Sequence, residues 1–253
     1  MNLFSLEHKT ALITGASRGI GESIAATFAE YGAHCILVSR KLDSLETVVD
    51  RIRSQGGSAE AMACNMGDLD QIASLMDAVE AKHGRLDILV NNAAANPYFG
   101  EMLHAEAWAW DKTHDVNLKG PFFMSQRAAI LMKKKGQGGA IVNVSSINGI
   151  RPAQMQGIYS ITKAALISMT QAFARELAPC GIRVNALLPG MTETKFSSAI
   201  TENEAVSKAV ISMIPLQRIA APSEMAGAAL YLVSDAASYT TGTCLICDGG
   251  MLA

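Results

Sequence analysis

The sequence Thr10-Ala-Leu-Ile-Thr14-Gly15-Ala-Ser-Arg-Gly19-Ile-Gly21 specifies the first strand, turn and helix of this 253-residue chain. Its first five residues form a short apolar run, which predicts a buried strand. Three glycines follow at the spacing Gly-x-x-x-Gly-x-Gly, and a helical pattern then continues through Tyr31. Glycines let the backbone approach a pyrophosphate, and a helix N-terminus offers free N–H groups. This order therefore predicts a dinucleotide-binding unit.

The rest of the chain repeats the alternation of apolar runs and helical patterns. Further strands are predicted at 33–38, 58–64, 86–90, 140–144, 182–188 and 244–247, and further helices at about 43–55, 68–83, 106–135, 156–178 and 222–233. Apolar runs without polar alternation indicate strands that are buried on both faces, as in parallel sheets. We predict one α/β domain over residues 1–253, a Rossmann-type doubly wound sheet of about seven parallel strands with helices on both faces.

Local signals within this pattern predict where elements start, bend and end. Asp43 is expected to cap the helix that runs to Gln55. Gly120-Pro121 is expected to bend or break the long helix at 106–135. Residues 191–215 have a less regular pattern than the rest, so we predict that they form a mobile lid over the substrate.

Composition excludes several classes of protein. A net charge of −2 without a long basic cluster predicts no nucleic-acid partner and no membrane partner. Residues 1–9 have no apolar leader core, and no apolar run is long enough to span a bilayer, so we expect neither secretion nor membrane insertion. The five cysteines are expected to be free thiols in a reducing, cytoplasmic compartment. No metal site is predicted.

Tyr159-Ser-Ile-Thr-Lys163 opens the helical pattern at 156–178, so its first and last side chains lie on one helix face. There the ammonium is expected to lower the pKa of the phenol, which can then exchange a proton with a carbonyl oxygen. Ser145-Ser146 ends the strand at 140–144, at the sheet edge where doubly wound folds bind ligands. Tyrosine and lysine at this four-residue spacing occur by chance in many helices. A serine at the neighbouring sheet edge favours the interpretation that Tyr159 and Lys163 form a proton-transfer site.

The end of the second predicted strand indicates which dinucleotide is bound. NAD sites carry an acidic residue there for the ribose 2′-hydroxyl, whereas NADP sites carry arginine. This chain has Ser39, Arg40 and Lys41, and Arg18 of the glycine loop can approach the same point. Arg40 and Lys41 could also simply occupy an exposed turn. We predict that NADP(H) is favoured over NAD(H), because two guanidinium groups would bind the extra phosphate.

Together with Asn91-Asn92-Ala93, Asn117 and Pro189-Gly190-Met-Thr-Glu-Thr194, these motifs make the chain from about residue 7 to Gly250 resemble the short-chain dehydrogenase/reductase family. The resemblance implies a catalytic set of Asn117, Ser146, Tyr159 and Lys163. Tyr159 would be the acid/base, and Lys163 would lower its pKa and hold the nicotinamide ribose. Ser146 would bind the substrate oxygen, and Asn117 would support Lys163 through a water-linked relay.

The predicted cofactor site combines these motifs with the residues that the resemblance adds. It comprises Gly15, Ser17, Arg18, Gly19, Ile20, Gly21, Ser39, Arg40, Lys41, Asn65, Met66, Asn92, Ala93, Tyr159, Lys163, Pro189, Gly190, Thr192 and Thr194. Two positions depart from the family pattern. Ala94 replaces a glycine that often follows Asn-Asn-Ala, and Asn65 replaces an acid that often contacts adenine. We expect altered adenine contacts but a retained site.

The residues around Asn96-Pro-Tyr-Phe-Gly100 look like those of the NADPH-dependent carbonyl and retinal reductase branch of the family. An apolar substrate pocket with adaptable methionines is predicted there. Its candidate residues are Asn96, Tyr98, Phe99, Ser146, Met155, Tyr159, Met191, Phe196 and Met213. The apolar members fit core or subunit contacts equally well.

The sequence therefore predicts an NADPH-dependent oxidoreductase that interconverts a small-molecule carbonyl and an alcohol by hydride transfer, with Tyr159 as acid/base. One alternative is a 3-oxoacyl-thioester (acyl-carrier-protein) reductase. Another, outside enzymes, is a dinucleotide-binding sensor or inert subunit. The helix after Tyr159 is apolar around most of its circumference, and family members pair this helix across two-fold axes. We therefore expect a homotetramer.

Overall fold

The computed structural model describes residues 2–194 and 204–253. Their strands form one parallel sheet of seven strands in the order β3-β2-β1-β4-β5-β6-β7. The strands are β1 (Thr10–Thr14), β2 (His34–Ser39), β3 (Ser58–Ala63), β4 (Ile88–Asn91), β5 (Gly139–Val144), β6 (Ile182–Pro189) and β7 (Cys244–Cys247). The predicted fold class is confirmed, and each predicted strand lies within two residues of an observed one.

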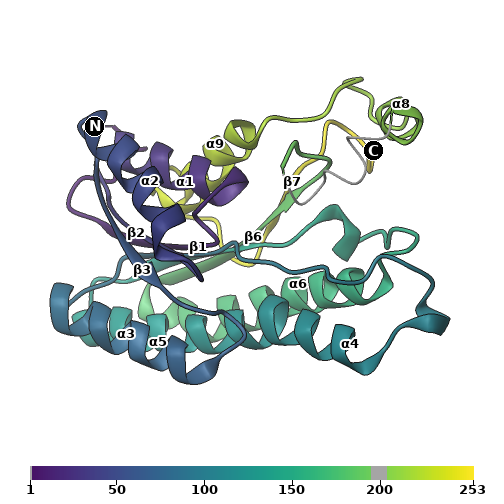
Figure 1. The fold of residues 1–253 in the computed structure, drawn as a ribbon. Helices are drawn as coiled ribbons and strands as arrows, with labels where there is room; N and C mark the ends of the chain where they lie inside the picture. Colours follow the sequence, from purple (N-terminus) through teal and green to yellow (C-terminus); the bar gives the residue numbers. More distant parts are fainter. Residues whose placement is uncertain (1, 195–203) are drawn as a thin grey trace.

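Helices cover both faces of the sheet. Figure 1 shows α1, α2 and α9 on one face, and α3, α4, α5 and α6 on the other. The helices are α1 (Gly19–Glu30), α2 (Leu42–Ser54), α3 (Leu69–His83), α4 (Ala107–His114), α5 (Gly120–Lys135), α6 (Gly157–Leu177), α8 (Glu204–Ser212) and α9 (Pro222–Val233). Short 3₁₀ turns are η1 (Met102–His104), η3 (Ile147–Gly149), η4 (Ala178–Cys180) and η5 (Asp235–Ala237).

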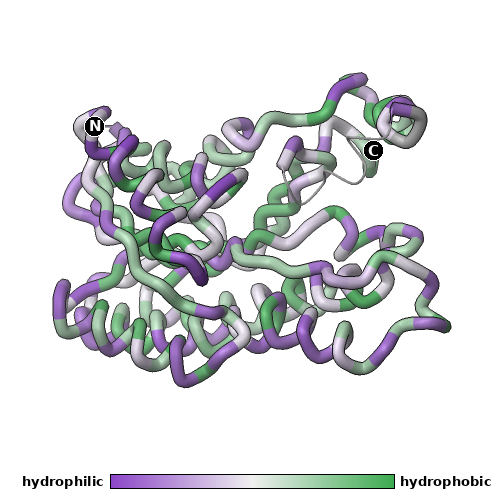
Figure 2. Tube along the Cα trace, in the orientation of Figure 1, coloured by the Kyte–Doolittle hydropathy of each residue, from purple (hydrophilic) through white to green (hydrophobic). Residues whose placement is uncertain are grey.

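Each face of the sheet has its own hydrophobic core, because successive strand residues point to opposite faces. Ile13 packs with the core under α1, α2 and α9, whereas its neighbour Leu12 packs with the core under α3, α5 and α6. Both side chains are fully buried, and burial of each contributes roughly 1.5–3 kcal/mol. Figure 2 shows hydrophobic, green stretches along the central strands, whereas hydrophilic, purple stretches lie on the helices and loops around them.

The ends of two helices illustrate how local sequence acts. Asp68 caps α3, because its carboxylate accepts from the backbone N–H groups of Asp70 and Gln71 at 3.1 Å each. The predicted cap at Asp43 is wrong. Lys41 occupies the N-cap position of α2 without a side-chain bond, and Asp43 lies inside the first turn. There its negative charge still interacts favourably with the helix dipole.

The long helix predicted at 106–135 is interrupted, but not at Gly120-Pro121. Residues Asp115–Lys119 (η2) form a π-helical segment between α4 and α5, and Gly120 already belongs to α5. A Cβ atom at Gly120 would lie 2.0 Å from the carbonyl oxygen of Met66, so only glycine allows this approach. The wider turn thus adjusts the path of the helix one turn before this close contact.

The segment at 191–215, predicted as a lid, contains two regular features among its described residues. Thr192 forms a parallel bridge with Ala220, and α8 takes up part of the segment. Residues 195–203 lie outside the described part of the chain. Cys244 and Cys247 have Cys-x-x-Cys spacing, but three positions along β7 place them on opposite faces, and both thiols are free. Among the described residues, no helix is both long and apolar enough to cross a membrane.

Candidate active site

The glycine loop is held against the end of β4 by a network that starts at Thr14. The Thr14 hydroxyl accepts hydrogen bonds from the backbone N–H groups of Asn92 and Ala93, both at 3.0 Å. The amide of Asn92 donates to the carbonyl oxygens of Thr14 and Gly15. A Cβ atom at Gly21 would lie 2.4 Å from that same amide nitrogen. Glycine is therefore required at position 21 by the close approach of two loops.

The N-terminus of α1 fits a phosphate group. Arg18 occupies its N-cap position and makes no side-chain capping bond, so the first N–H groups of the helix are not satisfied by a cap. Such groups, together with the helix dipole, bind phosphate well. A Cβ atom at Gly19 would lie 3.3 Å from the side chain of Thr194, so the chain after β6 returns to this loop. The predicted residues Pro189, Gly190 and Thr192 lie on that return path.

Positively charged residues lie on the two turns that follow β1 and β2. Arg18, Arg40 and Lys41 are all exposed, and none forms an ion pair with another residue that the structure describes. Ser39 Oγ donates to the Lys41 carbonyl oxygen at 3.2 Å and stabilises the turn. Guanidinium groups without an internal partner are available to an anionic ligand.

Tyr159 and Lys163 are buried together in the first turns of α6, with 7% and 2% of their surfaces exposed. The Lys163 ammonium lies 5.4 Å from the centre of the Tyr159 ring and donates to the Val144 carbonyl oxygen at 2.8 Å. An ammonium has three N–H donors, so this bond leaves donors for a ligand. The predicted pair therefore meets the end of β5 directly.

Ser145 and Ser146 follow β5 and have different partners. Ser146 forms a side-chain hydrogen bond with Tyr159, and its hydroxyl also accepts from the backbone N–H of Asn148 at 3.1 Å. Ser145 donates to the Lys163 carbonyl oxygen at 2.8 Å and is almost fully buried. Ser146 therefore faces Tyr159, whereas Ser145 joins the end of β5 to α6. The role of Ser146 in binding a substrate oxygen stays a prediction.

Burial is the main cause of the pKa shifts of Tyr159 and Lys163. It raises the pKa of Tyr159, a shift that the hydrogen bond with Ser146 only partly offsets, and it lowers the pKa of Lys163 to about 7. The direction for Tyr159 is opposite to the one expected from the nearby ammonium. The reason is that the free-energy cost of removing the Tyr159 phenolate from water exceeds the stabilisation that neighbouring groups give to it. At neutral pH the phenol therefore keeps its proton and can donate it.

Asn117 is fully buried in the π-helical segment, and its bonds differ from those expected. Its amide accepts from the Ala95 backbone N–H at 2.7 Å and donates to the Ala95 carbonyl oxygen at 2.8 Å. It also donates to Thr162 Oγ1 at 3.2 Å, and Thr162 in turn donates to the Tyr159 carbonyl oxygen. Asn117 thus joins the loop after β4 to α6 through Thr162. A water-linked connection to Lys163 stays a prediction.

Polar side chains from two loops meet beside Ser146. Asn96 and Asn148 both donate to the side-chain oxygen of Gln156, each at 3.4 Å. The loop after β4 also bonds the segment before α6 through Gly100 N–H and the Met155 carbonyl oxygen at 2.9 Å. The two loops therefore form one wall, with three amides close to the serine–tyrosine pair.

The other predicted site residues fall into three groups. Phe99, Met155 and Met213 are exposed. Tyr98 is half-buried, and its hydroxyl donates a hydrogen bond to the Glu101 carbonyl oxygen at 2.6 Å. Met191 lines a hollow of about 180 Å³ together with Leu216, Met225 and Cys247, while Phe196 lies outside the described residues. At the end of β3, Met66 is buried in the core, and Asn65 Oδ1 accepts from the Gly67 N–H at 3.2 Å.

Sequence reasoning missed several residues that hold the site together. Thr14, Gln156 and Thr162 act through bonds to segments that are distant in sequence, so no local spacing reveals them. Asn148 acts locally, through its bonds to Ser146 and Gln156. Gly149 carried a usable signal, because Asn-Gly marks a tight turn. A Cβ atom there would lie 2.8 Å from the Lys163 carbonyl group, so glycine is required where η3 packs on α6.

Comparisons with known proteins agree with this arrangement. Residues 15–252 match a family model described as enoyl-(acyl carrier protein) reductase. The rabbit (Oryctolagus cuniculus) dehydrogenase/reductase SDR family member 4 is 37% identical over 245 residues, which cover 97% of this chain and 94% of that protein. A short-chain type dehydrogenase/reductase from Mycobacterium marinum has a TM-score of 0.93 at 37% identity and covers 99% of this chain, and 98% of its own chain is covered.

A second solved structure is similar over the same length. It is a gluconate 5-dehydrogenase from Burkholderia cenocepacia J2315 in complex with NADP and tartrate, with a TM-score of 0.95 at 32% identity. The match covers 99% of this chain and 98% of the other. Fold, motif order and whole-length similarity therefore agree, and the chain is an enzyme of the short-chain dehydrogenase/reductase family.

Proposed function

We propose that this enzyme interconverts a ketone or aldehyde and the corresponding alcohol, with NADP(H) as its cofactor. The observation that carries the proposal is the hydrogen bond between Ser146 and Tyr159, whose ring centre lies 5.4 Å from the ammonium of the buried Lys163. Two hydroxyl groups that face each other can both bind one carbonyl oxygen. The uncapped N-terminus of α1 and the cationic end of β2 provide for the cofactor at the same sheet edge.

A nicotinamide bound at this edge would supply the hydride and, once oxidised, a positive charge. In carbonyl reduction, the Tyr159 hydroxyl donates its proton to the substrate oxygen as negative charge develops there. Ser146 donates a hydrogen bond to the same oxygen and fixes its position. Lys163, when protonated, stabilises the phenolate that remains on Tyr159.

Two features support NADP(H) rather than NAD(H). Arg18 and Arg40 are exposed on the turns that follow β1 and β2, where an adenosine ribose phosphate would lie, and no acidic residue occupies positions 39–41. In addition, the related gluconate 5-dehydrogenase was solved with NADP. Both guanidinium groups can make charge-assisted bonds to a phosphate, which are stronger than their bonds to a neutral ribose hydroxyl would be.

The substrate end supports a carbonyl compound with both apolar and polar parts. Phe99 and Met155 offer exposed apolar surface on the loops that meet beside Ser146, and the Asn96–Gln156–Asn148 amides line the same wall. Such a wall suits a ketone, an α-dicarbonyl or a retinoid aldehyde. The family-model description keeps an acyl-thioester substrate as the second candidate, because it names an acyl carrier protein.

The test is a screen of NADPH and NADH oxidation with ketones, α-dicarbonyls, retinal and an acetoacetyl thioester. We expect turnover with NADPH on at least one simple carbonyl compound. Tyr159→Phe should reduce kcat by roughly 10²–10⁴-fold while NADPH binding, measured by fluorescence titration, stays within about twofold. Tyr31→Phe, on an exposed tyrosine, is the matched control. Substantial turnover by Tyr159→Phe would reject the mechanism, and exclusive use of the thioester would favour the second candidate.

Assembly as a homotetramer is part of the proposal. Phe122 and Ile130 on α5 and Ile161 on α6 expose 39–62% of their surfaces, and the rings of Phe122 and Phe173 meet across the two helices at 5.4 Å. Exposed apolar side chains on two helices of the same face suit contact with a second copy of the chain. Light scattering at micromolar concentration should give four times the monomer mass, and a monomer mass would contradict the assembly.

A further inference from the structure

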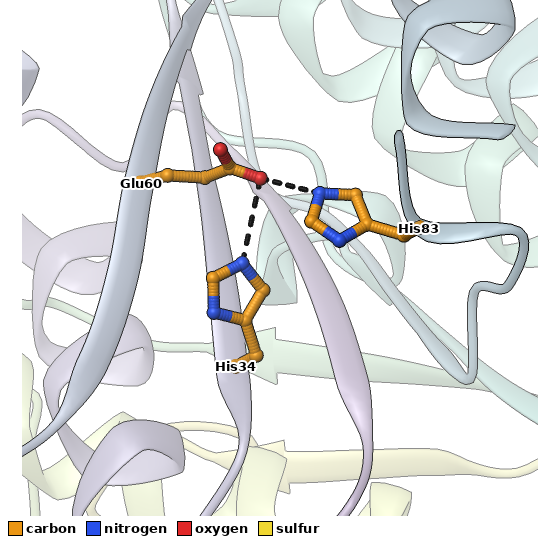
Figure 3. A group of neighbouring side chains, drawn as sticks. All are labelled: His34, Glu60 and His83. Carbon is orange, nitrogen blue, oxygen red and sulfur yellow. Dashed lines mark hydrogen bonds and ion pairs between the residues drawn. The ribbon is translucent and has the colours of Figure 1, made fainter. Parts of the chain in front are cut away.

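Three side chains that commonly bind metals converge at the amino edge of the sheet, opposite the catalytic edge. His34 is the first residue of β2, Glu60 lies on β3, and His83 is the last residue of α3. Figure 3 shows both imidazole rings directing a nitrogen at the same carboxylate oxygen. The three residues are 26 and 23 positions apart, so no spacing motif predicts this cluster from sequence.

The distances between the three ligand atoms suit a small tetrahedral ion. Glu60 Oε1 lies 3.4 Å from His34 Nε2 and 2.5 Å from His83 Nε2, and all three atoms lie within 4.8 Å of one another. Zinc–ligand bonds of about 2.0–2.1 Å in tetrahedral geometry separate neighbouring donors by about 3.3 Å. The His34–Glu60 distance already matches this value. His83 has to move back by about 0.8 Å, a shift that a side-chain rotation at a helix end provides.

The surroundings orient the ligands and leave an entry path. His34 Nδ1 bonds Ser58 Oγ at 2.7 Å, which directs Nε2 toward Glu60 in the way that outer contacts orient metal-binding histidines. The side chains are 31%, 12% and 16% exposed for His34, Glu60 and His83, so the cluster is sheltered but open to a water ligand. Lys82 pairs with the other carboxylate oxygen, Oε2, and its side chain is 58% exposed.

We propose that His34, Glu60 and His83 bind one divalent transition-metal ion, Zn²⁺ above all, through two imidazole nitrogens and one carboxylate oxygen, with water as the fourth ligand. Two histidines and one glutamate are a donor set that zinc accepts. The ion would join the start of β2, the middle of β3 and the end of α3. It would therefore stabilise the fold without contact to Tyr159, Ser146 or Lys163, and turnover should not depend on it.

The experiment uses tag-free, chelator-stripped protein titrated with ZnCl₂ by calorimetry. We expect one tight Zn²⁺ per chain and a thermal midpoint that rises by about 5–10 °C when free Zn²⁺ is a hundredfold above Kd. His34→Gln and His83→Gln should each weaken binding by about tenfold or more. His104→Gln, on an exposed histidine outside the cluster, should leave the affinity unchanged. Equal affinity in wild type and both cluster variants would overturn the proposal, because the ion would then bind elsewhere.

Lys82→Gln provides a second, independent arm. The Lys82 ammonium competes with a cation for the Glu60 carboxylate, so its removal should tighten Zn²⁺ binding by severalfold. Co²⁺ in place of Zn²⁺ should show the intense visible absorption of a tetrahedral site, and the cluster variants should lose it. Absence of Zn²⁺ binding in both wild type and Lys82→Gln would mean that the cluster is an ion-pair network only.

Discussion

Lys163→Met should make the folded protein more stable at neutral pH while it removes activity. Burial lowers the pKa of Lys163 from 10.5 to about 7, so the fold disfavours the charged ammonium. A shift of that size corresponds to about 4 kcal/mol at pH 7. Methionine fills a similar volume without the charge, but it leaves the Val144 carbonyl oxygen unpaired, at a cost of about 1–3 kcal/mol. The net gain in unfolding free energy should be on the order of 2 kcal/mol.

The pH dependence gives this prediction its sign. Because the folded pKa lies below the unfolded value, the destabilisation by Lys163 is fully present below about pH 7 and disappears as the pH approaches 10.5. The advantage of Lys163→Met should therefore shrink steadily between pH 7 and pH 10. Urea unfolding followed by tryptophan fluorescence, at one fixed protein concentration, measures the difference at each pH.

The control is Lys135→Met, which removes an exposed lysine at the end of α5 and should change the unfolding free energy by less than about 0.5 kcal/mol at any of these pH values. Activity provides a second readout, because Lys163→Met should lose nearly all turnover. A Lys163→Met variant that is less stable than wild type at pH 7 would refute the reasoning. So would a stability difference that stays constant as the pH rises, since the buried charge would then not be its cause.

Three further predictions concern the catalytic edge. Ser146→Ala should lower kcat by about 10²-fold, because it removes a hydrogen bond to the developing oxyanion. Ser145→Ala should mainly lower the urea midpoint of unfolding. Equal losses of kcat in the two variants would contradict these roles. Arg40→Asp should move the ratio of kcat/KM values for NADPH and NADH toward NADH by about tenfold or more, and an unchanged ratio would exclude Arg40 from the phosphate site. Asn92→Ala should raise the Kd for NADPH in a fluorescence titration, because its amide holds the carbonyl oxygens of Thr14 and Gly15; an unchanged Kd would show that the glycine loop keeps its shape without it.

The sheet could be predicted from sequence because each strand is a continuous apolar run that must be buried on both faces. Leu12 and Ile13 need no knowledge of their neighbours to be assigned to a core strand. The break in the long helix could not be located in the same way. Its position depends on the contact between Gly120 and the Met66 carbonyl oxygen, residues that the sequence places more than 50 positions apart.

The candidate site, too, could be predicted from the sequence only in part. Tyr159 and Lys163 lie on one helix face, so their spacing alone brings them together. The sign of the phenol's pKa shift could not be predicted, because it depends on burial, which only the packed structure reveals. The roles of Gln156 and Thr162 depend on loops that approach from other strands, and the His34–Glu60–His83 cluster joins three elements that share no motif.

Polar groups at the two edges of the sheet differ in how fully other groups of the protein satisfy them, and function explains this difference. At the catalytic edge, the buried position of Lys163 disfavours its charged form, and the N-terminus of α1 has no side-chain cap. The Asn91 amide oxygen there is the one buried side-chain polar atom among the described residues without a hydrogen-bond partner. At the amino edge, Glu60 has a partner on both oxygens. Groups that must bind a cofactor and move a proton cannot be saturated by the protein itself. Unsatisfied groups at the catalytic edge lower the stability of the fold. The two hydrophobic cores and the contacts at the amino edge have to compensate for this loss, because added interactions there do not hinder turnover.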